Sequence, residues 1–291
     1  DPVLRHVLTP GDPPALAALE LLFARGRRSP SAHSLESWLQ QAYGLDPAPD
    51  EAAESGLAAL GMQGDGLTPG TDLCAHADPV HLRVNPDGMA LTDSSLFAIA
   101  PDEAQALMAH LNTHFTGRLR LEPGSPTRWY ARVSGMPPLH CATLDEVRGG
   151  ALGAHLPHGA GGRAWQALLN EVQMALHEHP VNQAREARGA AVINSLWFWG
   201  AGVLRAPATR PHALVSADSP LARGLALASG ARCSALPADA AAWLREAPAE
   251  GVALIVIEAL RAPVAYADAE ACLDALQALE RDWLAPLLQA L

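Results

Sequence analysis

The sequence predicts an α/β fold whose core is a mainly parallel sheet flanked by helices. The chief observation is a series of short apolar runs in the C-terminal third, at 191–199, 213–216, 231–236 and 252–258. Helical segments at 220–229 and 239–246 lie between the later runs, as crossover helices do between buried parallel strands. A chain of 291 residues that is 49% hydrophobic can bury such a core. We expect the run at 191–199 to be the central strand.

The rest of the chain is expected to hold helices and a small amount of further sheet. Ser34 and Gly44 are suited to begin and end the second of the helices. Asn85-Pro86-Asp87-Gly88 predicts a hairpin between 80–84 and 89–91, and alternation predicts another strand at 128–133. Helical patterns occupy 13–25, 34–43, 50–60, 101–115, 163–177 and 268–291, the last expected to bend at Pro286; loops are expected at 47–49, 61–70 and 159–162.

Composition excludes two classes of partner. The formal net charge is −11 and every cationic side chain is Arg, so no basic stripe is available for nucleic acid. No apolar run reaches the length of about 20 residues that spans a bilayer, so no membrane partner is predicted. The four cysteines are far apart, which favours free thiols in a cytoplasmic protein. No signal peptide is visible, although a chain that begins at Asp1 without Met leaves open what precedes it.

Common catalytic and cofactor motifs are missing. There is no G-x-G-x-x-G after a strand, no Walker A loop, no H-E-x-x-H and no G-x-S-x-G. The 12 histidines include near pairs, but none has matched ligand spacing together with a carboxylate and a second pair. We therefore predict no metal site and no cofactor.

One constellation of polar side chains is typical of ligand binding. The segment from Asp78 to Asn85, with Arg83 in it, is polar at alternate positions, and a later helical segment adds further Arg and Asn side chains: Asn182, Arg185, Arg188 and Asn194. Arg binds carboxylate or phosphate through two parallel hydrogen bonds, and Asn binds hydroxyls, so a small anionic ligand would suit them. The alternative is structural: the arginines pair with Glu178 or Glu186, and Asp78 pairs with Arg83.

Several segments resemble one enzyme family. The stretch DPVHLRVN, with GLDP upstream at 44–47, resembles a segment of the archaeal-type cofactor-independent phosphoglycerate mutases of the alkaline phosphatase superfamily. The helix with Glu103 and Asn112, the stretch HPVNQAREARGAAVINSLWFWGAG and the stretch HALVSADSPLARGLALASG resemble later segments of that family, in order from about Gly44 to Ser229. Shorter bacterial proteins known as phosphoglycerate mutase-like or RpfE-type regulatory proteins resemble the chain more closely.

The resemblance implies an alkaline-phosphatase-like core at 1–77 and 190–291, with a smaller inserted α+β lobe at 78–189. It also brings together a ligand-binding set at the cleft between the two: Arg83, Asn85, Asn182, Arg185, Asn194 and Trp199. Trp199 stands where the family has Arg, and we expect it to be only partly buried at the rim. We expect Trp197 to face the same side and to pack against the helix at 163–177, with Phe198 on the other side.

The reaction centre of the family does not match this sequence. The family enzyme needs two metals, a Ser nucleophile near its N-terminus, and Asp and His ligands near both ends. No such block precedes Leu35, and the last histidine is His212. The resemblance therefore favours a degenerate, non-catalytic protein that binds a small ligand or regulates a protein partner. The alternative is an active phosphoglycerate mutase or related phosphoryl-transfer enzyme, whose missing residues lie upstream of Asp1 or whose chemistry has changed.

Overall fold

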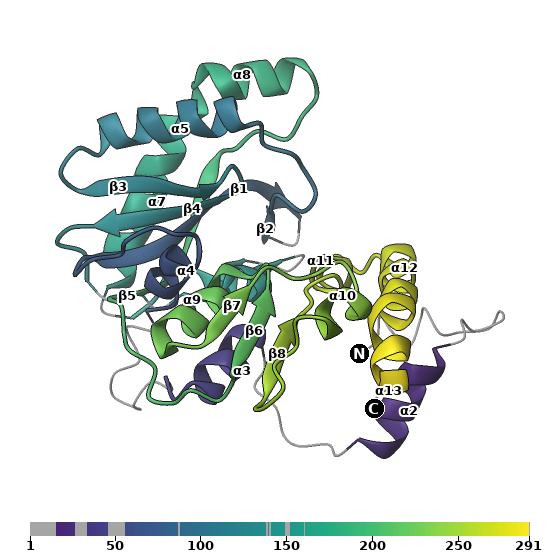
Figure 1. Cartoon of the computed structure of the whole chain (residues 1–291). Helices are drawn as coiled ribbons and strands as arrows, with labels where there is room; N and C mark the ends of the chain where they lie inside the picture. Colours follow the sequence, from purple (N-terminus) through teal and green to yellow (C-terminus); the bar gives the residue numbers. More distant parts are fainter. Residues whose placement is uncertain are drawn as a thin grey trace.

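The structure is a mixed α/β fold built on two separate sheets (Figure 1). It is a computed structural model that describes residues 16–26, 34–45, 56–86, 88–137, 139, 141–148, 152–159 and 161–290. One sheet has five strands and the other has three. No helix in these ranges is both long and apolar enough to cross a membrane.

The larger sheet is antiparallel and is organised around one long strand. Strand β1 (Leu73–Asn85) pairs with β5 (Ser195–Gly202) on one side. On the other side its first half pairs with β4 (Arg128–Val133) and its last residues pair with β2 (Gly88–Thr92). Strand β3 (Leu119–Ser125) completes the sheet beside β4. Strand β1 therefore contacts three strands and is the centre of the larger sheet.

Helices cover both faces of this sheet. Apolar side chains of α5 (Pro101–His114) and α7 (Gly162–His177) pack on one face, and α8 (Pro180–Ala187) lies beside α5 (Figure 1). The other face is covered by α4 (Leu57–Gly64), which is buried along almost its whole length. This second face turns toward the smaller sheet.

The smaller sheet is parallel. Its order is β7 (Arg232–Ser234), β6 (Leu214–Ala217), β8 (Ala253–Val256), and α9 (Pro220–Ser229) connects β6 to β7. The remaining elements are short: α2 (Ala17–Arg25), α3 (Leu35–Ala42), α6 (Leu144–Val147), the 3-10 turn η1 (Gly153–His155), α10 (Ala240–Leu244), α11 (Arg261–Ala265), α12 (Ala269–Leu279), the π-helical turn η2 (Glu280–Leu284) and α13 (Ala285–Ala290).

The expected mainly parallel sheet is confirmed only in part: the runs at 213–216, 231–236 and 252–258 form the parallel strands β6, β7 and β8, but the larger sheet is antiparallel. The apolar run expected as the central parallel strand forms β5 instead, an antiparallel neighbour of β1. An apolar run reports burial on both faces, and β5 has that burial between α7 and α4. The apolar run does not indicate which strand β5 pairs with, or in which direction. The division into 1–77, 78–189 and 190–291 stays a prediction, and β1 carries residues on both sides of its first boundary.

Several local expectations are confirmed. The Ser34 hydroxyl accepts a hydrogen bond from the backbone N–H of Ser37 at 3.2 Å, and Gly44 ends that helix with φ of +67°. The hairpin of β1 and β2 forms around residues 85–88, of which Asp87 lies outside the described residues. Three further parts of the predictions also lie outside them: the loop at 47–49, residues 50–55 of the predicted helix, and Ala160 of the loop at 159–162. The loop expected at 61–70 is wrong in its first residues, because α4 continues to Gly64. The last helical segment is interrupted by the π-helical turn η2, and Pro286 lies in α13 just after it; the bend expected at Pro286 stays a prediction.

Helices α4 and α9 approach each other backbone to backbone. A Cβ built at Gly64 would lie 1.9 Å from the carbonyl oxygen of Pro220, and one built at Gly224 would lie 1.9 Å from that of Leu60. Glycine at both positions is therefore required by the contact itself. The contact holds the parallel sheet against the second face of the antiparallel sheet.

Helix α2 depends on a residue near the other end of the sequence for its cap. It has no side-chain cap of its own at Leu16. Instead, the Glu280 carboxylate accepts hydrogen bonds from the backbone N–H groups of Ala18 at 2.6 Å and Leu19 at 3.0 Å. A carboxylate in this position satisfies donors that a helix start leaves free.

We predict that Gly224→Ala destabilises the protein by about 3 kcal/mol, at the upper end of the cost of overpacking, because backbone atoms cannot move away from the new methyl group. Chemical denaturation measures the change. The matched control is Gly153→Ala, where no heavy atom lies within 4 Å of the added Cβ. Equal effects of the two substitutions would show that the helices do not meet at Gly224.

Candidate functional site

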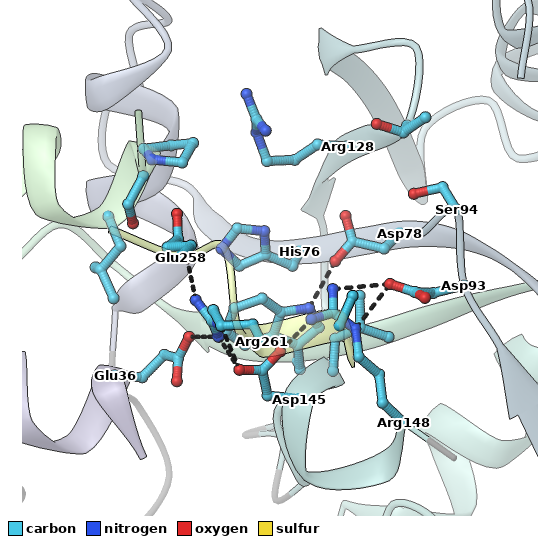
Figure 2. Close-up of a pocket in the computed structure, with 17 residues that line it drawn as sticks. Glu36, His76, Asp78, Asp93, Ser94, Arg128, Asp145, Arg148, Glu258 and Arg261 are labelled. Carbon is cyan, nitrogen blue, oxygen red and sulfur yellow. Dashed lines mark hydrogen bonds and ion pairs between the residues drawn. The ribbon is translucent and has the colours of Figure 1, made fainter. Parts of the chain in front are cut away.

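A cavity of about 330 Å³ lies where the two sheets meet (Figure 2). Strands β1 and β5 form one wall, and the start of α9 forms a second. Helices α3, α6 and α11 contribute charged side chains. The lining residues are Glu36, His76, Asp78, Asp93, Ser94, Thr127, Arg128, Leu144, Asp145, Arg148, Trp199, Ser219, Pro220, Leu221, Glu258, Arg261 and Ala262.

A chain of ion pairs forms the floor of the cavity. Arg261 pairs with Glu36, Asp145 and Glu258. Asp145 also pairs with Arg148.

The chain continues from Arg148 to Asp93, whose Oδ2 lies 2.8 Å from the arginine Nε. The Tyr266 hydroxyl donates to the other oxygen of Asp93 at 2.8 Å. These groups come from both sheet units, so the chain fixes one unit relative to the other. Each of its guanidinium groups is satisfied by carboxylates.

His76 is buried in the wall and held by aromatic rings. Its imidazole stacks on the Trp199 indole, with ring centres 3.9 Å apart and planes 6° apart, and the Tyr130 ring lies 4.9 Å away. Burial, with the positive charge of Arg128 nearby, lowers the pKa of His76 to about 3. The imidazole is therefore neutral at physiological pH.

Asp78 projects from the same side of β1 two residues further on (Figure 2). The Trp199 indole N–H donates a hydrogen bond of 2.8 Å to its Oδ2. Burial raises the pKa of Asp78 to about 7, although Trp199, Arg128 and Arg148 act in the opposite direction. This carboxyl therefore changes its charge near neutral pH.

Buried polar atoms without hydrogen-bond partners gather at this cavity. In the described part of the chain there are four such side-chain atoms, and three belong to cavity residues: both ring nitrogens of His76 and Oε2 of Glu36. The fourth is Oε1 of Gln63. An unpaired buried polar atom costs about 1–3 kcal/mol, so native proteins seldom keep one without a reason.

Two arginines of the polar constellation, Arg185 from the predicted ligand-binding set and Arg188, form ion pairs within the protein. Arg185 is 1% exposed and donates to Glu103 at 2.6 Å and to the backbone carbonyls of Ala98 and Ala191. Arg188 pairs with the same Glu103. The arginines are therefore paired as the structural alternative held, but with Glu103 rather than with Glu178 or Glu186.

The side-chain amides of Asn182 and Asn194 form hydrogen bonds with backbone groups. The Asn182 amide bonds the backbone of Leu176 and Ile193. The Asn194 amide accepts from the N–H of Leu82 at 2.8 Å and donates to its carbonyl at 2.9 Å, which extends the β1–β5 ladder by one step.

Arg83 and Asn85 are exposed near the tip of the hairpin and do not line the cavity. Of the six predicted site residues only Trp199 does so. Trp199 is 8% exposed, so its expected partial exposure is wrong. The alternation along β5 is confirmed, but Phe198 rather than Trp197 packs against α7, at 5.4 Å from the Trp165 ring.

The charged residues of the cavity floor could not be found from sequence patterns. Asp145 and Arg261 lie in the short helices α6 and α11, while Asp93 and Arg148 directly follow β2 and α6, and the four positions share no spacing. The detectable signal was in the first half of β1, where His76 and Asp78 interrupt a buried apolar run at positions that share one face.

The two-metal centre implied by the family resemblance does not fit these residues. His76 is the single histidine among the lining side chains of the described chain, and the floor carboxylates are already paired with arginine. No group of three or more His, Cys, Asp or Glu in the described residues is placed to hold a metal ion.

Comparison with known proteins connects the chain to one class of enzyme. No protein-family model matches it. A probable 2,3-bisphosphoglycerate-independent phosphoglycerate mutase of Geobacter sulfurreducens is 27% identical over 169 residues, which cover 55% of this chain and 40% of that enzyme. The chain is therefore homologous over part of its length to cofactor-independent phosphoglycerate mutases, and the match spans less than half of that relative.

Two solved structures are distant neighbours of the fold. The PH0037 protein from Pyrococcus horikoshii has a TM-score of 0.49 and 17% identity, with 87% of this chain and 65% of that chain covered. A cofactor-independent phosphoglycerate mutase from Thermoplasma acidophilum has a TM-score of 0.40 and 19% identity, with 87% and 73% covered.

We predict that Arg185→Ala lowers the free energy of unfolding by about 3 kcal/mol, because it removes one partner of a buried ion pair and leaves two carbonyls unpaired. Arg83→Ala should change it by less than about 0.5 kcal/mol, as exposed substitutions do. Urea denaturation of both variants measures this. If Arg185→Ala leaves the free energy of unfolding unchanged, Arg185 becomes a candidate for ligand binding again.

We predict that Asp78→Asn becomes more stable relative to wild type as pH rises. The folded wild type keeps a proton on Asp78 up to a pH of about 7, whereas the unfolded chain releases it around 3.8, the ordinary pKa of Asp. The wild type therefore loses stability across that window by up to about 4 kcal/mol, and the variant does not. Asn still accepts the Trp199 hydrogen bond, and His76 titrates equally in both proteins.

Denaturation at pH 4 and pH 8 gives the difference between wild type and Asp78→Asn at each pH. The control is Asp274→Asn, which makes the same change at an exposed position of α12. A difference that stays constant with pH would mean that Asp78 ionises normally.

Proposed function

We propose that this protein is a non-catalytic, phosphoglycerate mutase-like binding protein that takes a small ligand into the cavity between its sheets. The observation that carries the proposal is the unpartnered, 4% exposed His76 in the cavity wall. Its two ring nitrogens are one donor and one acceptor without partners, and Glu36 Oε2 is an unpaired acceptor of another lining residue. A ligand that satisfies these atoms would recover their desolvation cost.

The non-catalytic assignment is supported by how the side chains of the cavity are used. Arg148 and Arg261 form ion pairs with carboxylates of the protein, as Arg128 does with Asp65. Transition-state stabilisation of phosphoryl transfer needs positive groups that are aimed at the transferring phosphoryl oxygens. These arginines serve the fold, which suits binding or regulation in the manner of the shorter RpfE-type proteins.

A bacterial cytoplasm is the setting we propose. Cys74, Cys141, Cys233 and Cys272 are all free thiols, a state that reducing compartments maintain. A small anion is the ligand class predicted from the sequence. In a regulatory role, a protein partner would recognise the ligand-bound form of the protein. The anion proposal has lost Arg185 as its support, so its test is direct binding.

We predict that His76→Phe abolishes ligand stabilisation without unfolding the protein. Phe keeps the stack on Trp199 and removes both unpaired nitrogens, so the free energy of unfolding should rise by about 1 kcal/mol or more. Thermal shift with a panel of small anions, cations and neutral molecules, including 3-phosphoglycerate, identifies stabilising compounds in wild type. His114→Phe, at an exposed position of α5, should keep the stabilisation.

Two outcomes would overturn the proposal. If no compound of any charge raises the wild-type melting temperature, the cavity is not a ligand site. If the protein interconverts 3- and 2-phosphoglycerate in the presence of Mn²⁺, and His76→Phe loses that activity, the alternative of an active mutase is correct.

A further inference from the structure

The charge balance of the cavity identifies the class of ligand. Five carboxylates line it against three guanidinium groups. Arg128 is held by two hydrogen bonds to Asp65, of 2.7 and 2.8 Å. Together with the pairing of Arg148 and Arg261, this leaves no guanidinium group without a carboxylate partner in the described wall. An anion entering the cavity would have to displace a carboxylate of the protein.

Asp78 differs from the other four carboxylates. It is 5% exposed and has no arginine within ion-pair distance among the described residues, and its hydrogen bonds come from neutral groups, the Trp199 indole and the Trp129 backbone. A buried carboxylate without a cationic partner is costly to ionise, and a cation beside it removes much of that cost. It is therefore the lining group with most to gain from a positive charge.

His76 adds a second acceptor beside Asp78. The two residues share one face of β1 and both contact Trp199, one by stacking and one by hydrogen bond. A neutral imidazole offers a lone pair to a donor and carries no positive charge to attract an anion. Figure 2 shows the pair between Arg128 and the ion-pair chain.

We infer that the ligand of this cavity is a small amine, bound as its ammonium cation by the carboxylate of Asp78 and the unpartnered imidazole of His76. This inference rests on the proposed binding function and specifies the chemistry of its ligand. An ammonium group supplies up to three N–H donors and a positive charge, which matches the two acceptors and the excess of carboxylates. A cavity of about 330 Å³ admits a small molecule.

The inference has a distinctive dependence on pH. Cation binding favours ionised Asp78, and burial holds the pKa of that group at about 7. The charged or titratable groups facing it are His76 on its own strand, Arg128 and Tyr130 on β4, and Arg148 after α6. The two arginines stay charged and His76 stays neutral near pH 7. Amine affinity should therefore rise roughly tenfold from pH 6 to pH 8, because the ionised fraction of Asp78 rises by that factor.

The test compares short linear amines, alcohols and carboxylic acids of equal chain length by thermal shift and calorimetry. We expect one or more amines to bind and their matched alcohols and acids to fail. Asp78→Asn should lose at least tenfold in amine affinity and the pH dependence with it. Asp274→Asn, which removes an exposed carboxylate of α12, should bind as wild type does.

The outcomes separate this inference from the proposed function. Binding of acids or alcohols in preference to amines would overturn the inference and leave a ligand-binding cavity in place. Amine binding that survives in Asp78→Asn, or that weakens as pH rises, would also overturn it. Failure of every compound, in this series and in the wider panel, would overturn both.

Discussion

The close approach of α4 and α9 is the constraint on which the rest of the structure depends. Because Gly64 and Gly224 remove side chains from the crossing, the parallel sheet can lie directly against the antiparallel one. The start of α9 then faces β1, and Ser219 and Pro220 come to line the same cavity as His76. A larger residue at either glycine would separate these walls. The cavity is therefore a product of helix packing and not of a loop.

Ion pairs further connect the two sheet units that the glycines allow to lie close together. Arg261 reaches Glu36 and Asp145, which lie 225 and 116 residues away in the chain. Such pairs hold a geometry more than they add net stability, because the desolvation of the charges offsets much of their attraction. The same pairing neutralises the arginines that a phosphate would need. The pairing of these arginines with carboxylates of the protein thus makes the cavity rigid and also makes it a poor match for anions.

Local patterns in the sequence predicted local structure well. Ser34 as an N-cap, the hairpin of β1 and β2 and the strand at 128–133 depend on neighbouring residues, and each is present. The partner of β5 depends on β1, more than 100 residues earlier, so apolar periodicity could not show that it pairs antiparallel. The prediction of the ligand-binding residues had a similar limit. Asn182 and Arg185 have the chemistry of ligand contacts, but the backbone groups to which they hydrogen-bond are visible only in three dimensions.

The cap on α2 has a consequence for the order in which the protein is made. The Glu280 carboxylate that caps this helix lies 262 residues after Ala18, so the ribosome releases α2 long before its cap exists. A helix of 9 residues is marginal in water on its own. During synthesis α2 therefore has to wait for the segment around Glu280 before it can dock. Its docking is therefore a late event of folding on the ribosome.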